Sequence, residues 1–523
     1  MEPRARERVV VIGAGLGGLA AALPLAARGL AVTIVEAGEL PGGKARALEV
    51  GGRAVASGPT VCTLLPVIEA AFEDAGACLA DHVRLTRAQI LARHAWHDGS
   101  QLDLHADPAR SEAAIAAFAG AGEARAFRAF LAEAARIHRT LGPVFLHEQK
   151  TMPSGLSWRL GARRVGDLLA LRPYTPLWTA LCGHFRDPRL VQLFARYATY
   201  AGASPFQAPA TLMLIAHVEA EGVWLVEGGI AALAGALAEL ACRKGASIRY
   251  GTSAVGLLLN GARVAGVRLA GGEILAADHV VFNGDPSALA EGALGAEVAR
   301  AFVPTPRRAR SLSAFTLSLV ADCSGFPLSH HNVFFSRDYR REFAALRAGA
   351  IPEDATIYIC AEDRPAHAAP APAGPERLLA ILNAPAFGDV RTLSSQEIDR
   401  CTTGALETLA RIGLKVEPRA LRATQPSDFA RRFPGTGGAI YGRASHGPTG
   451  AFRRPGARTR IAGLFLAGGG VHPGAGVPMV MLSGRLAAEA LLADRASMSR
   501  FGRVAMPGGM SMPSPPTGAS ASP

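Results

Sequence analysis

Hydrophobic residues at the start of the chain follow the pattern of a β–α–β unit. Residues 7–12 form an apolar run that is typical of a short strand buried on both faces. A glycine-rich turn comes next, and residues 19–28 are predicted to form a helix that Gly29 closes. A second apolar run over residues 31–35 ends at Glu36. The pattern therefore predicts two parallel strands joined by a helix within about thirty residues.

Later segments switch between strand-like and helical periodicity. Apolar and polar residues alternate on both sides of Asp98-Gly99 and of Gly271-Gly272, which predicts two hairpins. Residues 110–200 have mostly helical periodicity. The expected elements are a hairpin over 89–105, a helix over 229–245, a strand near 247–250, a hairpin over 263–269 and 273–282, and a strand, turn and helix over 461–492.

Length and composition indicate a folded protein with more than one domain. The chain has 523 residues, which is too long for one ordinary core. Hydrophobic residues make up 49% of it, and this content excludes disorder as the overall class. The last segment, residues 496–523, is rich in Met, Ser, Pro and Gly, and we expect a disordered tail there.

The basic charge of the chain does not identify a partner by itself. The formal net charge is +12 and the pI is about 9.8, values that suit nucleic acid, an anionic membrane surface or acidic ligands. Lysine occurs only at positions 44, 150, 244 and 415, and no nucleic-acid-binding module accompanies the arginines. We therefore expect no nucleic-acid partner and keep a membrane surface open.

The cysteine spacing argues against a disulfide or metal-binding framework, and the glycines and prolines of one apolar run argue against a transmembrane segment. The 7 cysteines form no CxxC pair, which argues against a disulfide framework or a metal site and for a reducing compartment. Residues 461–484 carry no Asp, Glu, Lys or Arg and are long enough to cross a bilayer. Glycines and prolines interrupt this run, so no transmembrane segment is predicted.

The strongest local motif is Gly13-x-Gly15-x-x-Gly18, between the first strand and the helix. Gly13 permits a tight turn, Gly15 lets the backbone approach a pyrophosphate, and Gly18 lets helix and strand pack closely. The pyrophosphate would bind N–H groups at the positive end of the helix. Glu36 would accept hydrogen bonds from ribose hydroxyls. Inside a β–α–β unit this motif predicts a dinucleotide site, although it does not choose between FAD and NAD.

Three further segments carry a resemblance to a known family. They are Gly42-Gly43-Lys44-Ala45, Ser57-Gly58-Pro59-Thr60, and the run from Leu464 to Pro478. In this order they resemble the family that contains amine oxidases, phytoene desaturases and Rab GDP-dissociation inhibitors. The resemblance implies FAD as the cofactor. It also implies a cofactor-binding set of Gly13, Gly15, Gly18, Glu36, Ala37, Gly43, Lys44, Gly58, Pro59, Thr60, Val255, Gly469, Gly470, Gly476, Val477, Pro478 and Met479.

Within that family the chain resembles the carotenoid desaturases. Gly222-Val223-Trp224, Glu227-Gly228-Gly229 and the stretch from Leu91 to Leu104 carry this resemblance, the last of them to the hydroxycarotenoid 3,4-desaturases (methoxyneurosporene dehydrogenases). Amine oxidases usually carry an acidic residue where this chain has Gly470, which puts an amine-oxidase assignment in doubt. The implied reaction introduces the 3,4 double bond of a 1-hydroxy- or 1-methoxy-carotenoid of the neurosporene type, with a quinone or oxygen as electron acceptor.

Three alternatives stay open at this point. A phytoene desaturase, or a flavin-dependent carotene isomerase or saturase, would carry the same flavin motifs. A lipid carrier of the GDP-dissociation-inhibitor type would have this fold without redox chemistry, although the intact motif of Gly13, Gly15, Gly18 and Glu36 argues against it.

No catalytic residue follows from the sequence. Once a carbon beside a polyene has lost a hydride, the neighbouring proton is strongly acidic, so a strong protein base is not required. His472 is the best acid/base candidate, with a structural histidine bonded to backbone as its alternative. The weaker candidates are His330, His331, Tyr441 and His446.

The resemblance implies an α/β (α+β mixed) two-dinucleotide-binding-domain flavoprotein. A Rossmann-like FAD domain is expected over 1–90, 220–300 and 455–495, with a substrate and membrane-docking domain over 91–219 and 301–454. Because a carotenoid enters from a bilayer, we expect a cytoplasmic protein that is peripheral on the inner or photosynthetic membrane. The arginine-flanked helices near residues 110–215 are the predicted docking region.

Overall fold

A five-stranded parallel sheet carries the glycine-rich turn beyond the end of its central strand. The computed structural model describes residues 6–146, 148–150, 171–367 and 372–501. The strand order is β19-β13-β1-β2-β9, and every neighbouring pair is parallel. These strands are β1 (Arg8–Ile12), β2 (Ala31–Val35), β9 (Ser247–Arg249), β13 (His279–Phe282) and β19 (Leu464–Leu466). Segments far apart along the chain therefore build one sheet.

The first β–α–β unit is as predicted, except at the start of its helix. Helix α1 (Leu16–Ala27) begins before residue 19 and includes Gly17 and Gly18. A Cβ on Gly18 would lie 2.1 Å from the carbonyl oxygen of Gly13, so only glycine lets the helix start this close to the strand. Gly29 has a φ of +79° and closes the helix as expected.

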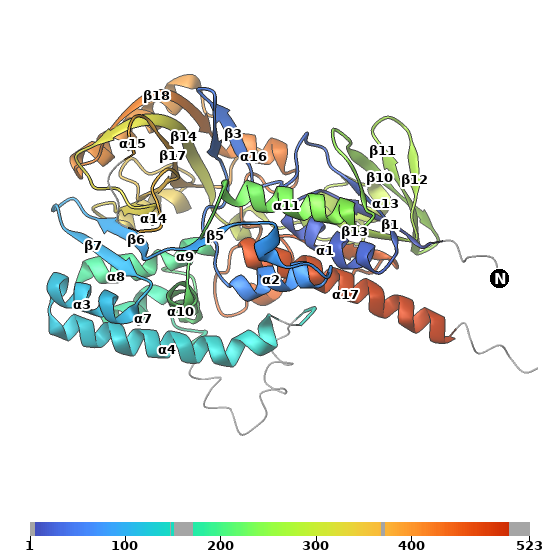
Figure 1. Cartoon of the computed structure of the whole chain (residues 1–523), viewed down its shortest axis with the longest axis horizontal. Helices are drawn as coiled ribbons and strands as arrows, with labels where there is room; N and C mark the ends of the chain where they lie inside the picture. Colours follow the sequence, from blue (N-terminus) through green and yellow to red (C-terminus); the bar gives the residue numbers. More distant parts are fainter. Residues whose placement is uncertain (1–5, 147, 151–170, 368–371, 502–523) are drawn as a thin grey trace, which may run out of the picture.

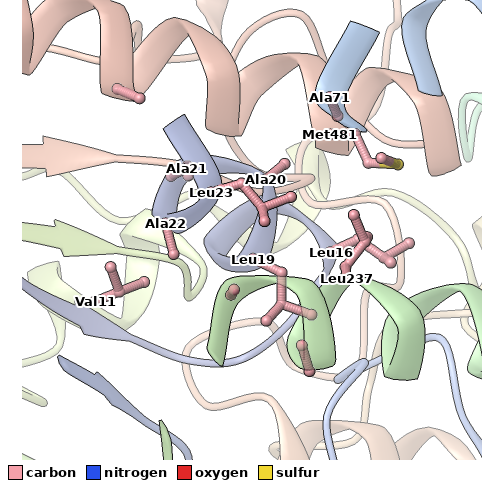
Figure 2. Packing of buried hydrophobic residues seen from close by; sticks show 14 of the residues in the cluster. Val11, Leu16, Leu19, Ala20, Ala21, Ala22, Leu23, Ala71, Leu237 and Met481 are labelled. Carbon is pink, nitrogen blue, oxygen red and sulfur yellow. The ribbon is translucent and has the colours of Figure 1, made fainter. Parts of the chain in front are cut away.

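Helix α1 is the centre of the larger hydrophobic core. Residues 16–26 are all buried, because α11 (Gly229–Arg243), α17 (Val477–Phe501) and α2 (Leu65–Glu73) surround the helix. Figure 2 shows α1 between α11, which carries Leu237, and α17, which carries Met481. Each fully buried leucine contributes about 2 kcal/mol. This packing fixes the N-terminal end of α1 against the sheet.

The second predicted hairpin is divided between two sheets. The sequence predicts one strand over 273–282. In the structure, only β12 (Ile274–Ala276) of this segment pairs with β11 (Arg263–Leu269). Strand β11 pairs on its other side with β10 (Ala254–Asn260). The following strand, β13, joins the parallel sheet between β1 and β19. All four residues of β13 are buried, as suits a central parallel strand that is covered on both faces.

The second large sheet is mixed and has seven strands, in the order β18-β14-β17-β16-β15-β6-β7. Only the pairing of β15 with β6 is parallel among these described strands. The predicted hairpin over 89–105 forms its β6–β7 edge. The strands are β6 (Ile90–Ala95), β7 (Gln101–His105), β14 (Ser313–Ser324), β15 (His331–Phe334), β16 (Ile357–Ala361), β17 (Glu376–Ala384) and β18 (Lys415–Thr424).

Helices cover the seven-stranded sheet (Figure 1). The long helix α4 (Ala121–Phe145) lies at the bottom of the view, below β6 and β7. The other helices that belong to this part are α3 (Pro108–Ala119), α7 (Leu177–His184), α8 (Pro188–Ala195), α9 (Tyr197–Tyr200), η3 (Ala210–Met213), α10 (Leu214–Glu221), η4 (Arg307–Ala309), α14 (Tyr339–Arg347), α15 (Ser395–Arg411), α16 (Pro426–Arg432) and η5 (Ala451–Arg453). The helical periodicity predicted for 110–200 is found over its described residues; residues 151–170 lie outside them.

A short hairpin connects the two sheets. Strands β3 (Ala47–Val50) and β4 (Arg53–Ala56) follow the FAD motifs along the chain, but Val50 and Val55 pack against Val320 of β14. The N–H of Ala56 donates to Glu362 Oε1 at 2.7 Å. The remaining elements are η1 (Leu79–Asp81), β5 (Leu85–Arg87), β8 (Trp224–Val226), α12 (Pro286–Ala290) and α13 (Ala296–Ala299).

The predicted domain division stays a prediction. The parallel sheet takes all its strands from the segments 1–90, 220–300 and 455–495. The seven-stranded sheet takes its strands from the other two segments, apart from Ile90 at the start of β6. The tail boundary at residue 496 falls inside helix α17, which continues to Phe501, and residues 502–523 lie outside the described part. Over the described residues, no helix combines the length and the apolar character that crossing a bilayer requires.

Candidate functional site

A continuous cavity of about 1720 Å³ runs from the glycine-rich turn into the space beneath the seven-stranded sheet. One end is lined by the turn, by the end of β2 and by the loop before α17. The other end is lined by apolar residues of α4, α10 and the seven-stranded sheet, among them Leu141, Ile215, Val218, Leu379 and Ile381. Pockets for one small molecule usually measure about 300–1,000 Å³. This cavity therefore has room for a cofactor and a second, largely apolar ligand.

The glycine-rich turn leaves the N-terminus of α1 open to the cavity. Gly13 has a φ of +100°, and its N–H donates to the carbonyl oxygen of Val35 at 2.8 Å. Gly15 is the N-cap of α1 and has no side chain to occupy the free N–H groups. A Cβ there would lie 2.7 Å from Nδ2 of Asn283, whose amide donates to the Gly13 carbonyl at 3.2 Å. The turn is thus a cradle that a side chain would fill.

Glu36 is held rigidly at the end of β2. Its Oε2 accepts from the N–H of Ala14 at 2.7 Å, and its Oε1 accepts from the N–H of Gly38 at 2.8 Å. Each carboxylate oxygen keeps a lone pair for a ligand hydroxyl. Glu36 and Ala37 both line the cavity. The geometry suits the ribose contact that the sequence predicted for Glu36.

Val255, which was predicted to bind the cofactor, does not line the cavity. Its residue is 46% exposed, and the cavity wall at this point consists of Thr252, Ser253 and Ala254. Successive side chains of a strand point to opposite faces, and Ala254 is the one that faces inward. The N–H of Thr252 donates to the carbonyl oxygen of Glu36 at 2.8 Å, which holds this segment beside the ribose position.

Lys44 and Arg46 bring positive charge to the cavity wall. The Nζ of Lys44 donates to the carbonyl oxygen of Ile440 at 2.8 Å and lies 5.2 Å from the centre of the Phe433 ring. Desolvation lowers the pKa of Lys44 to about 8, although Asp285 opposes this shift. Desolvation also lowers the pKa of Arg46 to about 10, and its buried Nε has no partner among the described residues. Both cations are poorly solvated and would be stabilised by an anionic ligand.

The segment 57–60 connects the cofactor end of the cavity to the seven-stranded sheet. Gly58, Pro59 and Thr60 all line the cavity. A Cβ on Gly58 would lie 1.9 Å from the carbonyl oxygen of Lys44, so two predicted motifs pack directly together. The hydroxyls of Thr60 and Tyr358 are 2.6 Å apart, and Tyr358 OH is 2.7 Å from Nδ1 of His331.

The loop before α17 closes the cofactor end. Six residues that were predicted to bind the cofactor line the cavity here: Gly469, Gly470, Gly476, Val477, Pro478 and Met479. Buried Arg454 ties this loop in place: Nη1 donates to the carbonyl oxygen of Gly469 at 2.6 Å, and Nη2 donates to those of Tyr441 and Arg443 at 3.0 Å and 2.6 Å. The first turn of α17 presents its N-terminus to the cavity, where it favours negative charge.

Steric crowding explains why a glycine occupies position 470. A Cβ there would lie 2.7 Å from Cδ of Pro286 and 2.9 Å from Oδ2 of Asp285. Asp285 is the N-cap of α12, where its Oδ1 accepts from the N–H of Ser287 at 2.9 Å. The carboxylate at this position therefore comes from Asp285 and not from residue 470.

His472 is placed as a structural residue. It is buried outside the cavity lining, and its Nε2 lies 2.7 Å from the carbonyl oxygen of Phe145, to which it donates. Burial lowers its pKa. The ring also contacts the Phe145 ring at 4.6 Å between centres. His472 therefore connects α4 to the loop before α17, which is the alternative that the sequence left open.

Of the weaker candidates, only Tyr441 reaches the cavity. His446 accepts from the N–H of Ser204 at 3.0 Å through Nε2. Nδ1 of His330 donates to the carbonyl oxygen of Arg364 at 2.8 Å, and its Nε2 is 3.5 Å from Sγ of Cys360. His330, His331 and Cys360 thus lie together, and burial lowers the pKa of both histidines.

The residues at the cofactor end fit FAD. The glycine cradle and the N-terminus of α1 suit a pyrophosphate, and the two carboxylate oxygens of Glu36 suit ribose hydroxyls. Lys44 and the unpartnered Nε of Arg46 add positive charge nearby. Sequence reasoning missed Arg46, Asn283, Asp285 and Arg454. Arg46 directly follows the predicted segment Gly42-Gly43-Lys44-Ala45 and could have been found from it, whereas only their approach in space reveals the other three.

Three comparisons with known proteins agree with this geometry. The model of the family "Flavin containing amine oxidoreductase" matches residues 16–492. The chain is 48% identical to a hydroxyneurosporene desaturase of Rubrivivax gelatinosus, over 99% of each chain. It is also 48% identical to a hydroxyneurosporene desaturase of Cereibacter sphaeroides, over 94% of this chain and 99% of that one. An oxidoreductase from Methanosarcina mazei shares the fold, with a TM-score of 0.58, 17% identity, and coverage of 92% of this chain and 100% of that one.

Proposed function

Since the chain belongs to the flavin containing amine oxidoreductases and, within them, to the carotenoid desaturases, we propose that it introduces the 3,4 double bond of a hydroxylated, neurosporene-type carotenoid. FAD is the cofactor. The observation that carries this proposal is the continuous cavity, which joins a dinucleotide cradle to an apolar chamber. An apolar polyene would lie in that chamber with one end toward the loop before α17.

When bound, FAD supplies the hydride acceptor, and the tasks left to the protein are positioning and exclusion of water. The apolar wall formed by Leu141, Ile215 and Val218 orients the chain of the carotenoid and keeps water from the reacting carbons. The carbon next to the one that loses a hydride becomes strongly acidic, so a weak base is sufficient to take its proton. Asp285, whose Oδ2 would lie 2.9 Å from a Cβ on Gly470, is a polar group beside this loop that could accept it.

The protein takes its substrate from a membrane surface in this proposal. Tyr174 lines the cavity and is 84% exposed, which suits a mouth that faces lipid. Four arginines, Arg125, Arg128, Arg136 and Arg139, are exposed on α4, whose C-terminal end lines the cavity through Leu141 and Phe145. An anionic bilayer surface attracts such a basic face, and an aromatic side chain suits the interface between lipid and water.

A carrier function is less well supported by this cavity. A carrier needs only the apolar chamber, whereas the cradle at Gly15 and the fixed carboxylate of Glu36 have no purpose in lipid transport. Phytoene desaturase uses the same two compartments. The two desaturases differ in the carotenoid that they convert, and turnover is the measurement that separates them.

The test is an anaerobic incubation of the holoenzyme with a quinone and, in separate samples, 1-hydroxyneurosporene or phytoene. We expect a red shift of the absorbance with the hydroxylated carotenoid alone, because one more double bond extends the conjugated system. The matched control is Gly15→Val, which fills the cradle, prevents flavin binding and abolishes the shift. A shift with phytoene alone would assign the protein as a phytoene desaturase. Carotenoid binding without any bound flavin would favour the carrier.

A further inference from the structure

Two histidines and a cysteine meet at one place in the seven-stranded sheet. His331 begins β15 and lies directly opposite Cys360 of β16 in the antiparallel pairing, so the two side chains share one face of the sheet. His330 precedes the strand, and its ring is 4.7 Å from that of His331 between centres. One ligand atom from each residue lies within 4.8 Å of the other two. Imidazole nitrogen and thiolate sulfur are ligands that Zn²⁺ prefers.

The separation of His330 from Cys360 matches that of two ligands on one metal ion. Nε2 of His330 is 3.5 Å from Sγ of Cys360. In a tetrahedral site with bonds of about 2.0 Å to nitrogen and about 2.3 Å to sulfur, these two ligand atoms lie about 3.5 Å apart. Nδ1 of His330 donates to the carbonyl oxygen of Arg364 at 2.8 Å, which leaves Nε2 of the neutral ring without a proton. Metal-binding histidines are oriented in this way.

His331 has a buried nitrogen without a partner. Its Nδ1 lies 2.7 Å from the hydroxyl of Tyr358, which is 2.6 Å from that of Thr60. The protons of His331 and Tyr358 both have an acceptor when Nδ1 donates to Tyr358 and Tyr358 donates to Thr60. Nε2 then keeps a lone pair, and no group among the described residues donates to it. A buried acceptor that stays unpaired is unfavourable, and a cation would satisfy it.

We propose that His330, His331 and Cys360 bind a Zn²⁺ ion. A small rotation of the His331 ring brings the three ligands to bonding distance, and a water molecule completes the tetrahedron. The Cys360 thiol releases its proton to solvent when the Zn–S bond forms, and both histidines bind as neutral imidazoles. His330 is partly exposed and gives the ion a route from solvent, whereas His331 and Cys360 are 2% and 1% exposed.

The ion has a structural role behind the cavity wall. It links β15 to β16, and His331 in turn holds Tyr358, which lines the cavity together with Thr60. The three ligands themselves do not line the cavity, so the inference does not depend on the desaturase function. Cysteine spacing along the chain gives no sign of this site, because its ligands come from neighbouring strands.

The test is metal binding by the holoprotein. After dialysis against a chelator, the protein is incubated with Zn²⁺ or with Co²⁺, which takes the same ligands and is coloured. We expect one bound Zn²⁺ per chain by elemental analysis, and a higher Tm with Zn²⁺ than without it. Co²⁺ should give a thiolate-to-cobalt band in the near ultraviolet and d–d bands at longer wavelengths than flavin absorbs.

Cys360→Ser and His330→Gln each remove one ligand. Loss of a residue that only orients a ligand lowers metal affinity by about 10–100-fold, so loss of a ligand should lower it by at least about a hundredfold. Cys360→Ser should also lose the thiolate-to-cobalt band. FAD content should stay at the wild-type level in both variants and shows that they are folded. If the buried Cys360→Ser does not fold, the partly exposed His330→Gln still decides the outcome.

Two control variants separate this site from other candidates. Cys62→Ser changes a cysteine that is as fully buried as Cys360 but lies outside the cluster, and it should keep the metal. His217→Gln changes a second group, His138, His217 and Glu221, whose ligand atoms also lie within 4.8 Å of one another. It should leave the thiolate-to-cobalt band intact.

Three results would overturn the inference. The first is a wild type that holds no metal after incubation with Zn²⁺. The second is wild-type affinity in His330→Gln or in a folded Cys360→Ser. The third is loss of the metal in His217→Gln or in Cys62→Ser. None of these results concerns turnover, so each leaves the proposed desaturase function standing.

Discussion

Lys44 illustrates how one buried side chain can depend on the cofactor. Its ammonium group has one backbone acceptor, the Ile440 carbonyl, and one aromatic neighbour, Phe433. Desolvation lowers its pKa to about 8, and the charge of Asp285 compensates for only part of this effect. The anionic diphosphate of FAD would favour the charged form of Lys44. The pKa of Lys44 should therefore be higher in the holoprotein than in the apoprotein.

This difference makes the affinity for FAD dependent on pH. Below about pH 8 Lys44 is protonated in both states, and the affinity should be constant. Above that pH the apoprotein has lost the proton, so binding must take one up and the affinity should fall as the pH rises, by up to tenfold per pH unit. Titration of apoprotein with FAD, followed by flavin fluorescence between pH 7 and 10, measures this.

Two variants complete the pH experiment. Lys44→Met should bind FAD more weakly at pH 7 and show little change with pH. Lys415→Met removes an exposed lysine that pairs with Glu417 and should keep the wild-type curve. A falling affinity that persists in Lys44→Met would assign the pH dependence to another group.

At the level of elements, the contact between α1 and α17 holds the cofactor end together. The two helices cross where Gly484 of α17 faces Gly17 of α1, and a Cβ on Gly484 would lie 2.0 Å from the carbonyl oxygen of Gly17. The N-terminus of each helix lines the cavity. Their close approach therefore sets the position of both helix ends relative to FAD.

Gly484→Ala should separate these helices. The added methyl group meets backbone, which cannot rotate away, so the free energy of unfolding should fall by about 1–3 kcal/mol. FAD content after purification should fall as well, because the N-terminus of α1 moves with the helix. Thermal unfolding and the ratio of flavin to protein absorbance measure the two effects.

Gly404→Ala is the matched control for this helix contact. Gly404 lies within α15, and a Cβ there would meet nothing within 4 Å outside its own helical turn. The substitution should be neutral or stabilise the protein by up to about 1 kcal/mol. Equal destabilisation by both substitutions would mean that the α1–α17 contact is not the cause.

At the level of the whole molecule, residues of two sheets line one cavity, and Leu141, Gly142 and Phe145 of α4 line its far end. The net charge of +12 gives the protein a general attraction to anionic surfaces. The exposed arginines of α4 concentrate part of this charge: spacings of three and eleven residues put Arg125, Arg136 and Arg139 on one side of the helix. This side is the proposed membrane-binding surface.

Replacement of Arg125, Arg136 and Arg139 by Gln should weaken binding to vesicles that contain anionic lipid. Each basic residue near an anionic surface contributes about 1 kcal/mol, so the loss should be about a hundredfold, and less at high salt. Co-sedimentation with vesicles measures it. The control replaces three exposed arginines elsewhere, Arg300, Arg308 and Arg347, and changes the net charge by the same amount. Equal loss in both triple variants would point to net charge alone and contradict a defined binding surface.

The sequence by itself determined the parts of the protein that depend on short stretches of chain. The turn at Gly13, Gly15 and Gly18, the burial of β1 and β2, and the carboxylate of Glu36 at the end of β2 follow from local backbone conformation and hydrophobic pattern. The family resemblance added the cavity-lining glycines of the loop before α17. Such features are predictable because every residue they need lies within a few positions.

Only the tertiary structure decided what lies opposite these motifs. Asn283 and Asp285 lie far from the motifs along the chain, and no local pattern marks them. The same limit explains the error over the second hairpin, because the sheet that β13 joins depends on segments far away along the chain. A cavity forms between segments that meet after folding, so the residues of its wall are determined by packing rather than by their order in the sequence.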